Sequence, residues 1–344
     1  MLPTASDLLR LVLAFALPCI VVFALMPRYL NFLRSKGRLA TDVHKPQQTK
    51  VPTPAGPLLI AAIVAGEAAI YLVNASTIPL VAIEVTLIAG LIGLYDDLRG
   101  LGGIVKPALL TVAAAPLLLE ELVHHSLYTA SLAFPLFGTT GTHFIIFAIL
   151  IVVAMPVSAN AFNMLDAFNG EIAGFTVIAS IALIAGITME AVASATFNYT
   201  RLAAALPLAA TAVCFYVYNR YPSKAFDGDS GSLTFGALFA ALAIMGGVEI
   251  AALVALIPAV LNSYYILSSM RGFVEHKQML ARPTYLGDDG KLHAAEGAKA
   301  PTTIVRMVLL GSPMTEKEIV QSILTLTVFA CALSILTSAL TWFT

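Results

Sequence analysis

The stretch Leu94-Tyr95-Asp96-Asp97-Leu98-Arg99-Gly100-Leu101 closes an apolar run that begins at Ile78. The run is long enough for a helix to cross the hydrocarbon core of a bilayer, which takes about 17 to 25 residues. Two adjacent carboxylates at the end of such a helix repel each other and cost free energy near lipid. We therefore expect a metal ion or a phosphate-handling task to compensate them.

The composition of the whole chain is that of a membrane protein. Of its 344 residues, 59% are hydrophobic and 11% are charged, and the mean hydropathy is +0.88. So little polar surface cannot cover a soluble globule. The three cysteines are scattered inside apolar runs, so no disulfide framework is expected. No basic stripe with interleaved aromatic residues indicates a nucleic-acid partner.

Ten apolar segments are candidates for membrane-spanning helices. We therefore predict an all-α, polytopic integral membrane bundle of about ten helices. It forms one domain over residues 1–344, with a cytoplasmic loop lobe at about residues 268–317. The predicted helices are Leu8–Leu25, Pro57–Val73, Ile78–Leu94, Pro107–Leu122, Phe144–Ala161, Ile172–Thr188, Leu202–Tyr218, Gly231–Met245, Val248–Leu267 and Ile319–Thr341.

The basic residues predict the orientation of these helices. With ten crossings, the loops after helices one, three, five, seven and nine share one face, and they carry 17 of the 19 Lys and Arg residues. Cytoplasmic loops carry such an excess of positive charge. We therefore expect a multi-pass protein of the cell membrane, with its active site facing the cytoplasm and both termini outside.

The loops after helices one and three hold groups suited to phosphate chemistry. His44 and Lys45 lie in a proline-rich segment that would hold them over an anion, although a basic membrane anchor is the alternative. Asp96 and Asp97 would bind a metal or accept a proton while Lys106 holds phosphate oxygens. The alternative for the acids is simple solvation at the headgroup level.

The loops after helices five and seven add oxygen ligands. Asn160, Asn163 and Asp166 recur at intervals of three, so on a helix their oxygens line one face and favour a hard cation such as Mg²⁺. The segment Phe226-Asp227-Gly228-Asp229 places a glycine-flanked acid at a helix start, where the backbone can approach an anionic ligand. Phe226 offers a ring face to a base. Helix capping is the alternative for both loops.

Four further positions carry predictions. The loop after helix nine offers His276 and Arg282, and Arg282 would bind phosphate or sugar unless it is a basic anchor. Glu67 and Glu84 lie within predicted spans, where an acid is costly unless it is protonated or paired. We expect them to form structural hydrogen bonds between the second and third helices.

Taken in order, these motifs resemble the polyprenyl-phosphate N-acetylhexosamine-1-phosphate transferases, a superfamily of the glycosyltransferase family 4 type. The resemblance rests on Asp96-Asp97, on residues 160–174, on Phe226-x-Gly228-Asp229 and on the arginine of the last cytoplasmic loop. It implies a cytoplasmic active site, Mg²⁺ with Mn²⁺ as the alternative ion, a nucleotide-sugar donor and a polyprenyl phosphate acceptor in the lipid. The last loop lacks the bacterial histidine cluster, which favours the archaeal and eukaryotic members that act on dolichyl phosphate.

The resemblance also implies a role for each matching residue. Asp96, Asp97 and Asp229 would be catalytic, with the adjacent pair handling the acceptor, and Asn163 and Asp229 would hold the metal. The substrate-binding set would be Lys106 at the pyrophosphate, Phe226 on uracil, Asn169 at the nucleotide, and His44, Lys45, His276 and Arg282.

The function predicted from these features is transfer of N-acetylglucosamine-1-phosphate from a UDP-sugar to dolichyl phosphate, with release of UMP. This would be a first step of lipid-linked glycan assembly for protein glycosylation. Direct attack by the lipid phosphate and attack by an aspartate to form a covalent intermediate both remain open. An intramembrane prenyltransferase using magnesium and a prenyl diphosphate, and a cation- or proton-coupled transporter, are the alternatives. A homodimer is left open.

Overall fold

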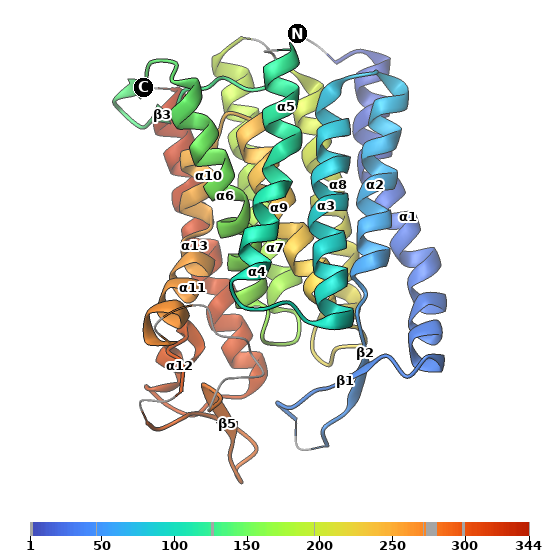
Figure 1. Ribbon diagram of the computed structural model, residues 1–344, viewed down its shortest axis with the longest axis vertical. Coiled ribbons are helices and arrows are strands. Elements are labelled where there is room, and N and C mark those ends of the chain that lie inside the picture. The colour runs from blue at the N-terminus through green and yellow to red at the C-terminus, as the bar shows by residue number, and fades with distance from the viewer. Residues whose placement is uncertain are drawn as a thin grey trace.

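The computed structural model describes residues 3–45, 47–124, 127–195, 197–270, 272, 281–297 and 300–343. Long helices lie side by side along one axis, and both termini lie at the same end (Figure 1). Two hairpins lie at the opposite end, and a third lies near the termini. The hairpins are β1 (Leu39–Thr41) with β2 (Lys50–Pro52), β5 (Thr284–Leu286) with β6 (Leu292–Ala294), and β3 (Ala133–Phe134) with β4 (Gly138–Thr139).

Helices make up most of the described chain. They are α1 (Ala5–Ser35), α2 (Gly56–Val73), α3 (Thr77–Arg99), α4 (Val105–Leu110), η1 (Thr111–Ala114), α5 (Ala115–His124), α6 (Phe144–Leu165), α7 (Glu171–Ala193), α8 (Tyr199–Asn219), α9 (Asp229–Met245), α10 (Glu249–Ala255), α11 (Ile257–Met270), α12 (Ile304–Leu309) and α13 (Glu316–Trp342).

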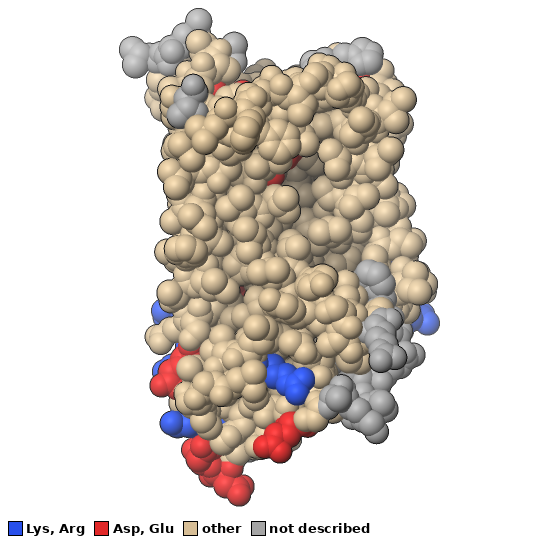
Figure 2. All heavy atoms as spheres, turned by 90° about the vertical axis from the view of Figure 1, so that its left-hand side faces the viewer, with Lys and Arg blue, Asp and Glu red and all other residues tan. Residues whose placement is uncertain are grey.

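The fold class predicted from the sequence is confirmed. Within the described residues, eight helices are long and apolar enough to cross a membrane, counting residues 105–124 as one. The pair α10 and α11, bent by 65°, makes a ninth if it is one span, and α9 is a shorter apolar helix. Each of the ten predicted segments overlaps one of these helices. Figure 2 shows most of the charged atoms of this face gathered at the hairpin end, below a broad band with few charged atoms.

The predicted loop lobe is described over residues 281–297 and 300–317. It contains the hairpin of β5 and β6, the short helix α12 and the first residues of α13. Leu292 in β6 pairs with Met314 through two backbone hydrogen bonds, so the hairpin is joined to the start of α13.

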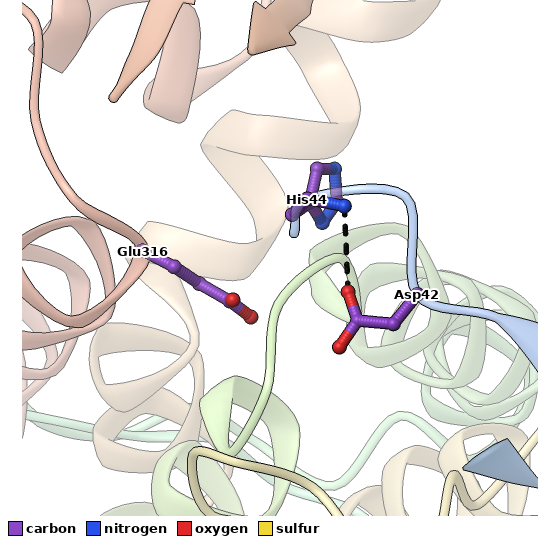
Figure 3. A group of neighbouring side chains, drawn as sticks. All are labelled: Asp42, His44 and Glu316. Carbon is purple, nitrogen blue, oxygen red and sulfur yellow. Dashed lines mark hydrogen bonds between the residues drawn. The ribbon is translucent and has the colours of Figure 1, made fainter. Parts of the chain in front are cut away.

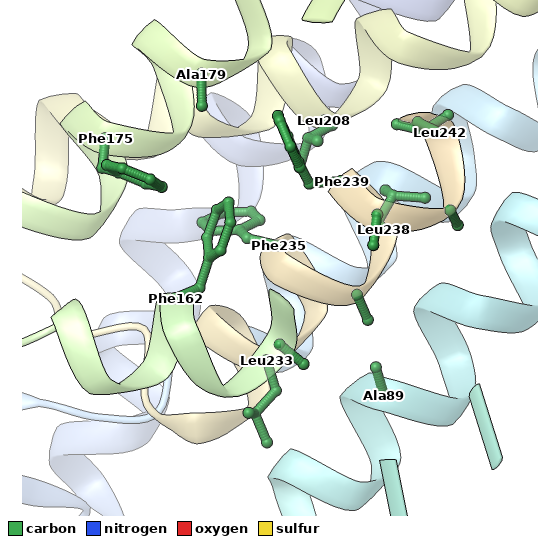
Figure 4. Close-up of a cluster of buried hydrophobic side chains, with 14 of the residues drawn as sticks. Ala89, Phe162, Phe175, Ala179, Leu208, Leu233, Phe235, Leu238, Phe239 and Leu242 are labelled. Atoms are coloured by element: carbon green, nitrogen blue, oxygen red, sulfur yellow. The ribbon is translucent and has the colours of Figure 1, made fainter. Parts of the chain in front are cut away.

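The helix α9 lies at the centre of the bundle. Every residue from Ser230 to Met245 is buried, as expected for a helix that is apolar on all sides. Phe235 and Phe239 pack with Phe162 of α6, and Leu208 of α8 lies close by (Figure 4). Because neighbouring helices enclose α9, they also determine where its first residue, Asp229, is held.

Candidate active site

The backbone segments that precede α2 and α9 are joined by hydrogen bonds. The amide of Phe226 donates to the carbonyl of Pro52 at 3.0 Å, and the carbonyl of Phe226 accepts from Ala55 at 2.8 Å. The amide of Gly56 donates to the carbonyl of Asp227, also at 2.8 Å. The N-terminal ends of α2 and α9 therefore lie beside each other.

Two glycines make the close approach around Asp229 possible. Gly228 has a φ of +72°, and a Cβ there would lie 2.6 Å from Cβ of Pro54 and 2.7 Å from Oδ1 of Asp97. A Cβ on Gly93 of α3 would lie 2.5 Å from the carbonyl oxygen of Asp229. Only a residue without a side chain fits either position, and the start of α9 is therefore held tightly against α3.

Asp97 caps the N-terminus of α9 from a neighbouring helix. Its Oδ1 accepts the backbone N–H of Asp229 at 2.8 Å. Its Oδ2 accepts the backbone N–H of Ser230 at 3.0 Å and the Ser230 hydroxyl at 2.6 Å. A carboxylate in this position satisfies free amides and the helix dipole. The catalytic role predicted for Asp97 stays a prediction, while its contacts are those of a helix cap.

Lys106 of α4 joins acids from two other helices. Its Nζ forms ion pairs with Asp96 of α3 and, at 2.7 Å, with Oδ2 of Asp229. It also lies 3.5 Å from Oδ1 of Asn163 on α6, whose amide donates to Oδ1 of Asp229 at 2.7 Å. Four residues predicted to act together thus meet from four helices.

Two more acids lie beside these residues. Burial raises the pKa of Asp166 to about 7, and the negative charges of Asp229 and Asp97 add to the effect. Burial and the neighbouring Asp166 raise the pKa of Asp227 well above its ordinary value. Neither oxygen of Asp227 finds a donor in the described part of the chain, so a proton on either acid would be shared by the pair.

We call this group the α9 cluster. It comprises the residues Asp96, Asp97, Lys106, Asn163, Asp166, Asp227 and Asp229. Sequence reasoning assigned no separate role to Asp227 or to Ser230. The available signal was their place inside the segment that leads into α9.

A second polar group, the Asp42 cluster, lies between the β1–β2 hairpin and the start of α13; it comprises Asp42, His44, Lys45, Asn169 and Glu316. Oδ2 of Asp42 accepts from Lys45 Nζ at 2.5 Å and from the Asn169 amide at 2.9 Å. The backbone N–H of Asn169 donates to Oε1 of Glu316 at 2.9 Å. The residues of two predicted loops are thus brought onto α13.

The ring of His44 belongs to this second cluster. It stacks on Phe168 with 4.4 Å between ring centroids. Burial lowers the pKa of His44 to about 4, against the pull of Asp42, and the positive charges of Arg282 and Lys45 lower it further. The imidazole is therefore neutral near pH 7.

The other predicted positions are placed as follows. Phe226 is half-buried and joins the two loops through its backbone, and Arg282 is exposed with its charge felt at His44. His276 lies outside the described residues. Glu84 is exposed on α3.

The structure corrects the prediction that Glu67 forms a hydrogen bond between helices. Glu67 is fully buried in α2, and neither of its oxygens has a partner among the described residues, so this prediction is wrong. The reason lies in the packing, because Ile63 and Ile70, which share its helix face, are buried and apolar.

Comparisons with known proteins bear on this site. The model of the family described as Glycosyl transferase family 4 matches residues 79–247, which include the whole α9 cluster. A "Putative glycosyltransferase" of Methanocaldococcus jannaschii is 28% identical, over 95% of this chain and 95% of its own length. A "Putative UDP-N-acetylglucosamine--dolichyl-phosphate N-acetylglucosaminephosphotransferase" of Saccharolobus solfataricus is 29% identical, over 73% and 77%. A phospho-N-acetylmuramoyl-pentapeptide-transferase of Acetivibrio thermocellus is 30% identical, over 68% and 71%.

Proposed function

This chain belongs to glycosyl transferase family 4, and from that premise we propose that it transfers N-acetylglucosamine-1-phosphate from UDP-N-acetylglucosamine to a dolichyl-type phosphate. UMP is the leaving product. The chain is a membrane phosphosugar transferase by family and by helix content. The choice of donor and acceptor is supported by the name of the Saccharolobus relative and by the absence of a bacterial-type histidine cluster from the sequence.

The charge balance of the α9 cluster is the observation that carries the proposal. The cluster contains five carboxyl groups and one ammonium group, that of Lys106, which pairs with two of them. Such a site binds a cation together with the anionic substrate that the cation accompanies. Asp229 remains accessible, since 32% of its side chain is exposed.

The donor atoms of this cluster fit a hard divalent cation. The Lys106 ammonium already lies among oxygens of Asp96, Asp229 and Asn163, and oxygen is the ligand that Mg²⁺ prefers. We propose that Asn163 and Asp229 hold Mg²⁺, with Mn²⁺ as the alternative ion. When bound, the ion supplies positive charge to the pyrophosphate.

The protein residues then divide the remaining work. An oxygen of the acceptor phosphate forms a bond to the β-phosphorus of the UDP-sugar, and the bond from that phosphorus to the bridging oxygen breaks. Lys106 offsets the charge on the phosphate oxygens. Asp97 is engaged by α9 through both oxygens, whereas Asp96 is paired with Lys106 through Oδ2 and accepts the backbone N–H of Leu101 at Oδ1. Asp96 is the better candidate to keep the acceptor deprotonated, because it lies beside the lysine that would hold the phosphate oxygens.

The donor would extend from this cluster toward the β1–β2 hairpin. Phe226 and Pro52 are joined through their backbones, so residue Phe226 lies at the junction of the two loops. In the proposal the ring of Phe226 stacks on uracil, and Asn169 contacts the nucleotide. His44, Lys45 and Arg282 lie on the same side and would bind the sugar or its phosphates.

A transfer assay tests the proposal. Purified protein in detergent, given UDP-N-acetylglucosamine and polyprenyl phosphate, should release UMP only with Mg²⁺ or Mn²⁺. Asp229→Ala should abolish release, whereas Asp289→Ala, at an exposed acid of the β5–β6 turn, should not. Product formation at the wild-type rate in Asp229→Ala would refute the metal assignment.

The same assay addresses the donor and the alternatives. A panel of UDP-sugars should give the highest rate with N-acetylglucosamine, and a higher rate with another sugar would replace the proposed donor. A prenyltransferase would release diphosphate, and a transporter would move solute across vesicles without forming UMP.

A further inference from the structure

Three side chains of the Asp42 cluster are arranged as metal ligands. Asp42 and His44 follow β1, and Glu316 begins α13. Each of the three offers one ligand atom, and these atoms lie within 4.8 Å of one another. Figure 3 shows the Glu316 carboxylate extending toward Asp42 from the opposite side of the group.

A buried carboxylate oxygen in this group lacks a partner. Glu316 is only 5% exposed, and its Oε1 accepts the Asn169 amide, while Oε2 has no hydrogen-bond partner among the described residues. Leaving such an oxygen unpaired costs about 1 to 3 kcal/mol or more. This oxygen is therefore open to a cationic or donor ligand, which no described residue supplies.

The Asp42 carboxylate also has an oxygen available. Lys45 and Asn169 both contact Oδ2. Among the described residues, Oδ1 accepts only a long bond of 3.3 Å from the backbone N–H of His44. An ion on Oδ1 would therefore leave the Lys45 contact intact.

The donor atoms determine the class of ion. One imidazole nitrogen with two carboxylate oxygens suits zinc and similar transition-metal ions, whereas Mg²⁺ favours an all-oxygen shell. Three protein ligands leave a fourth position for water. This set differs from the α9 cluster, whose side-chain ligands are all oxygen.

We propose that Asp42, His44 and Glu316 form a second metal site that takes a transition-metal ion of the Zn²⁺ class. The ion ties the segment after β1 to the start of α13, across Asn169. This site shares His44 with the proposed donor side, but its ligand atoms and its class of ion differ from those of the α9 cluster, and its test measures ion binding and not the transfer reaction.

Cobalt is the probe that tests this site, because Co²⁺ replaces Zn²⁺ and absorbs visible light. The full chain, purified in detergent with its histidine tag removed and treated with chelator, is titrated with Co²⁺ in the presence of excess Mg²⁺. We expect one equivalent to bind with a visible band that shows nitrogen ligation. Zn²⁺ should displace it.

Variants assign the ligands. His44→Ala and Glu316→Gln should each weaken Co²⁺ binding by at least about tenfold, since changes even outside the ligand shell cost 10–100-fold. Glu316→Gln keeps a carbonyl oxygen for the Asn169 amide, and an unchanged thermal midpoint shows that it folds. His293→Ala, at an exposed histidine paired with Asp289, and Asp229→Asn should both retain binding.

Two results would overturn the site. One is Co²⁺ binding that is unchanged in both His44→Ala and Glu316→Gln. The other is binding lost in Asp229→Asn but kept in those two variants, which would place the ion in the α9 cluster.

Discussion

Two groups of acidic side chains lie at the same end of the bundle, and they are built differently. The α9 cluster takes its residues largely from packed helices, and Lys106 is shared by Asp96 and Asp229. The Asp42 cluster takes its residues from a hairpin loop, a turn and a helix start, and it contains an imidazole. The difference shows that neighbouring acids acquire separate chemistry through the elements that hold them and the donor atoms that accompany them.

The largest expected effect is on catalysis, and it should differ between Lys106 of the α9 cluster and Lys45 of the Asp42 cluster. Lys106→Met should lower kcat by about 100-fold or more, because it removes the cation beside the reacting phosphates. Lys45→Met should act mainly on KM for the UDP-sugar, because Lys45 belongs to the donor side of the proposal. Steady-state kinetics with both substrates would measure this, and an equal loss of kcat in both variants would remove the distinction between the clusters.

Asp97 should contribute to stability as the cap of α9, in addition to any role in the reaction. Asp97→Asn removes a charged acceptor from the N-terminus of α9 and should cost about 2 to 3 kcal/mol of unfolding free energy. Thermal unfolding in detergent would show a lower midpoint. Asp289→Asn, at an exposed acid, is the matched control and should not shift it. A wild-type midpoint in Asp97→Asn would argue against the capping role.

Two glycines, one before α9 and one before β1, allow the cost of steric overlap to be measured apart from the cost of backbone strain. Gly228 has a φ of +72° with no room for a Cβ, whereas Gly37, on the way to β1, has a φ of +66° with nothing within 4 Å. Alanine at either position is destabilising, because a side chain disfavours a positive φ. Gly228→Ala should cost about 1 to 3 kcal/mol more than Gly37→Ala, from overpacking. Equal midpoints for the two variants would contradict the tight fit around Asp229.

Asp166 and Asp42 should contribute to stability with opposite pH dependence. The pKa of Asp166 is raised to about 7 by burial, so the folded state binds its proton more tightly and stability falls as the pH rises from about 4 to about 7. Burial acts the same way on Asp42, but hydrogen bonds from Lys45 and Asn169 lower its pKa overall. Its stabilising contribution is therefore present above about pH 4 and is lost as the pH falls below it.

Asp166→Asn tests this contrast. The variant should be more stable than the wild type at pH 8, by several kcal/mol at about 1.4 kcal/mol per pKa unit, and equal to it near pH 4. Unfolding would be followed in chelator, so that no divalent ion changes the charge of the α9 cluster. A constant difference between the two proteins across this pH range would exclude Asp166 as the titrating group.

Much of the fold could be predicted from the sequence because its signals are local. Each of the ten apolar segments has a length set by its own residues, and each overlaps a helix. The candidate residues Asp96, Lys106, Asn163 and Asp229 also meet, because the helix ends that carry them lie at the same end of the bundle. These are the C-terminal ends of α3 and α6 and the N-terminal ends of α4 and α9. The different partners of the two adjacent acids could not be predicted. Asp97 contacts the start of α9, whereas Asp96 pairs with Lys106. The prediction for Glu67 was wrong for the same reason, because the partner of a side chain on another helix depends on how the helices pack.

By itself, the sequence determined that this chain is a bundle of membrane helices and that its polar groups gather at one end. The physical reason is that hydrophobic length and side-chain chemistry belong to each segment alone. Only the tertiary structure decided which acid meets which partner. Lys106 and Asp229 are 123 residues apart, and Asn169 and Glu316 are 147 apart. Such pairs exist only where packed helices bring distant segments together, and this packing gives two similar groups of acids different partners.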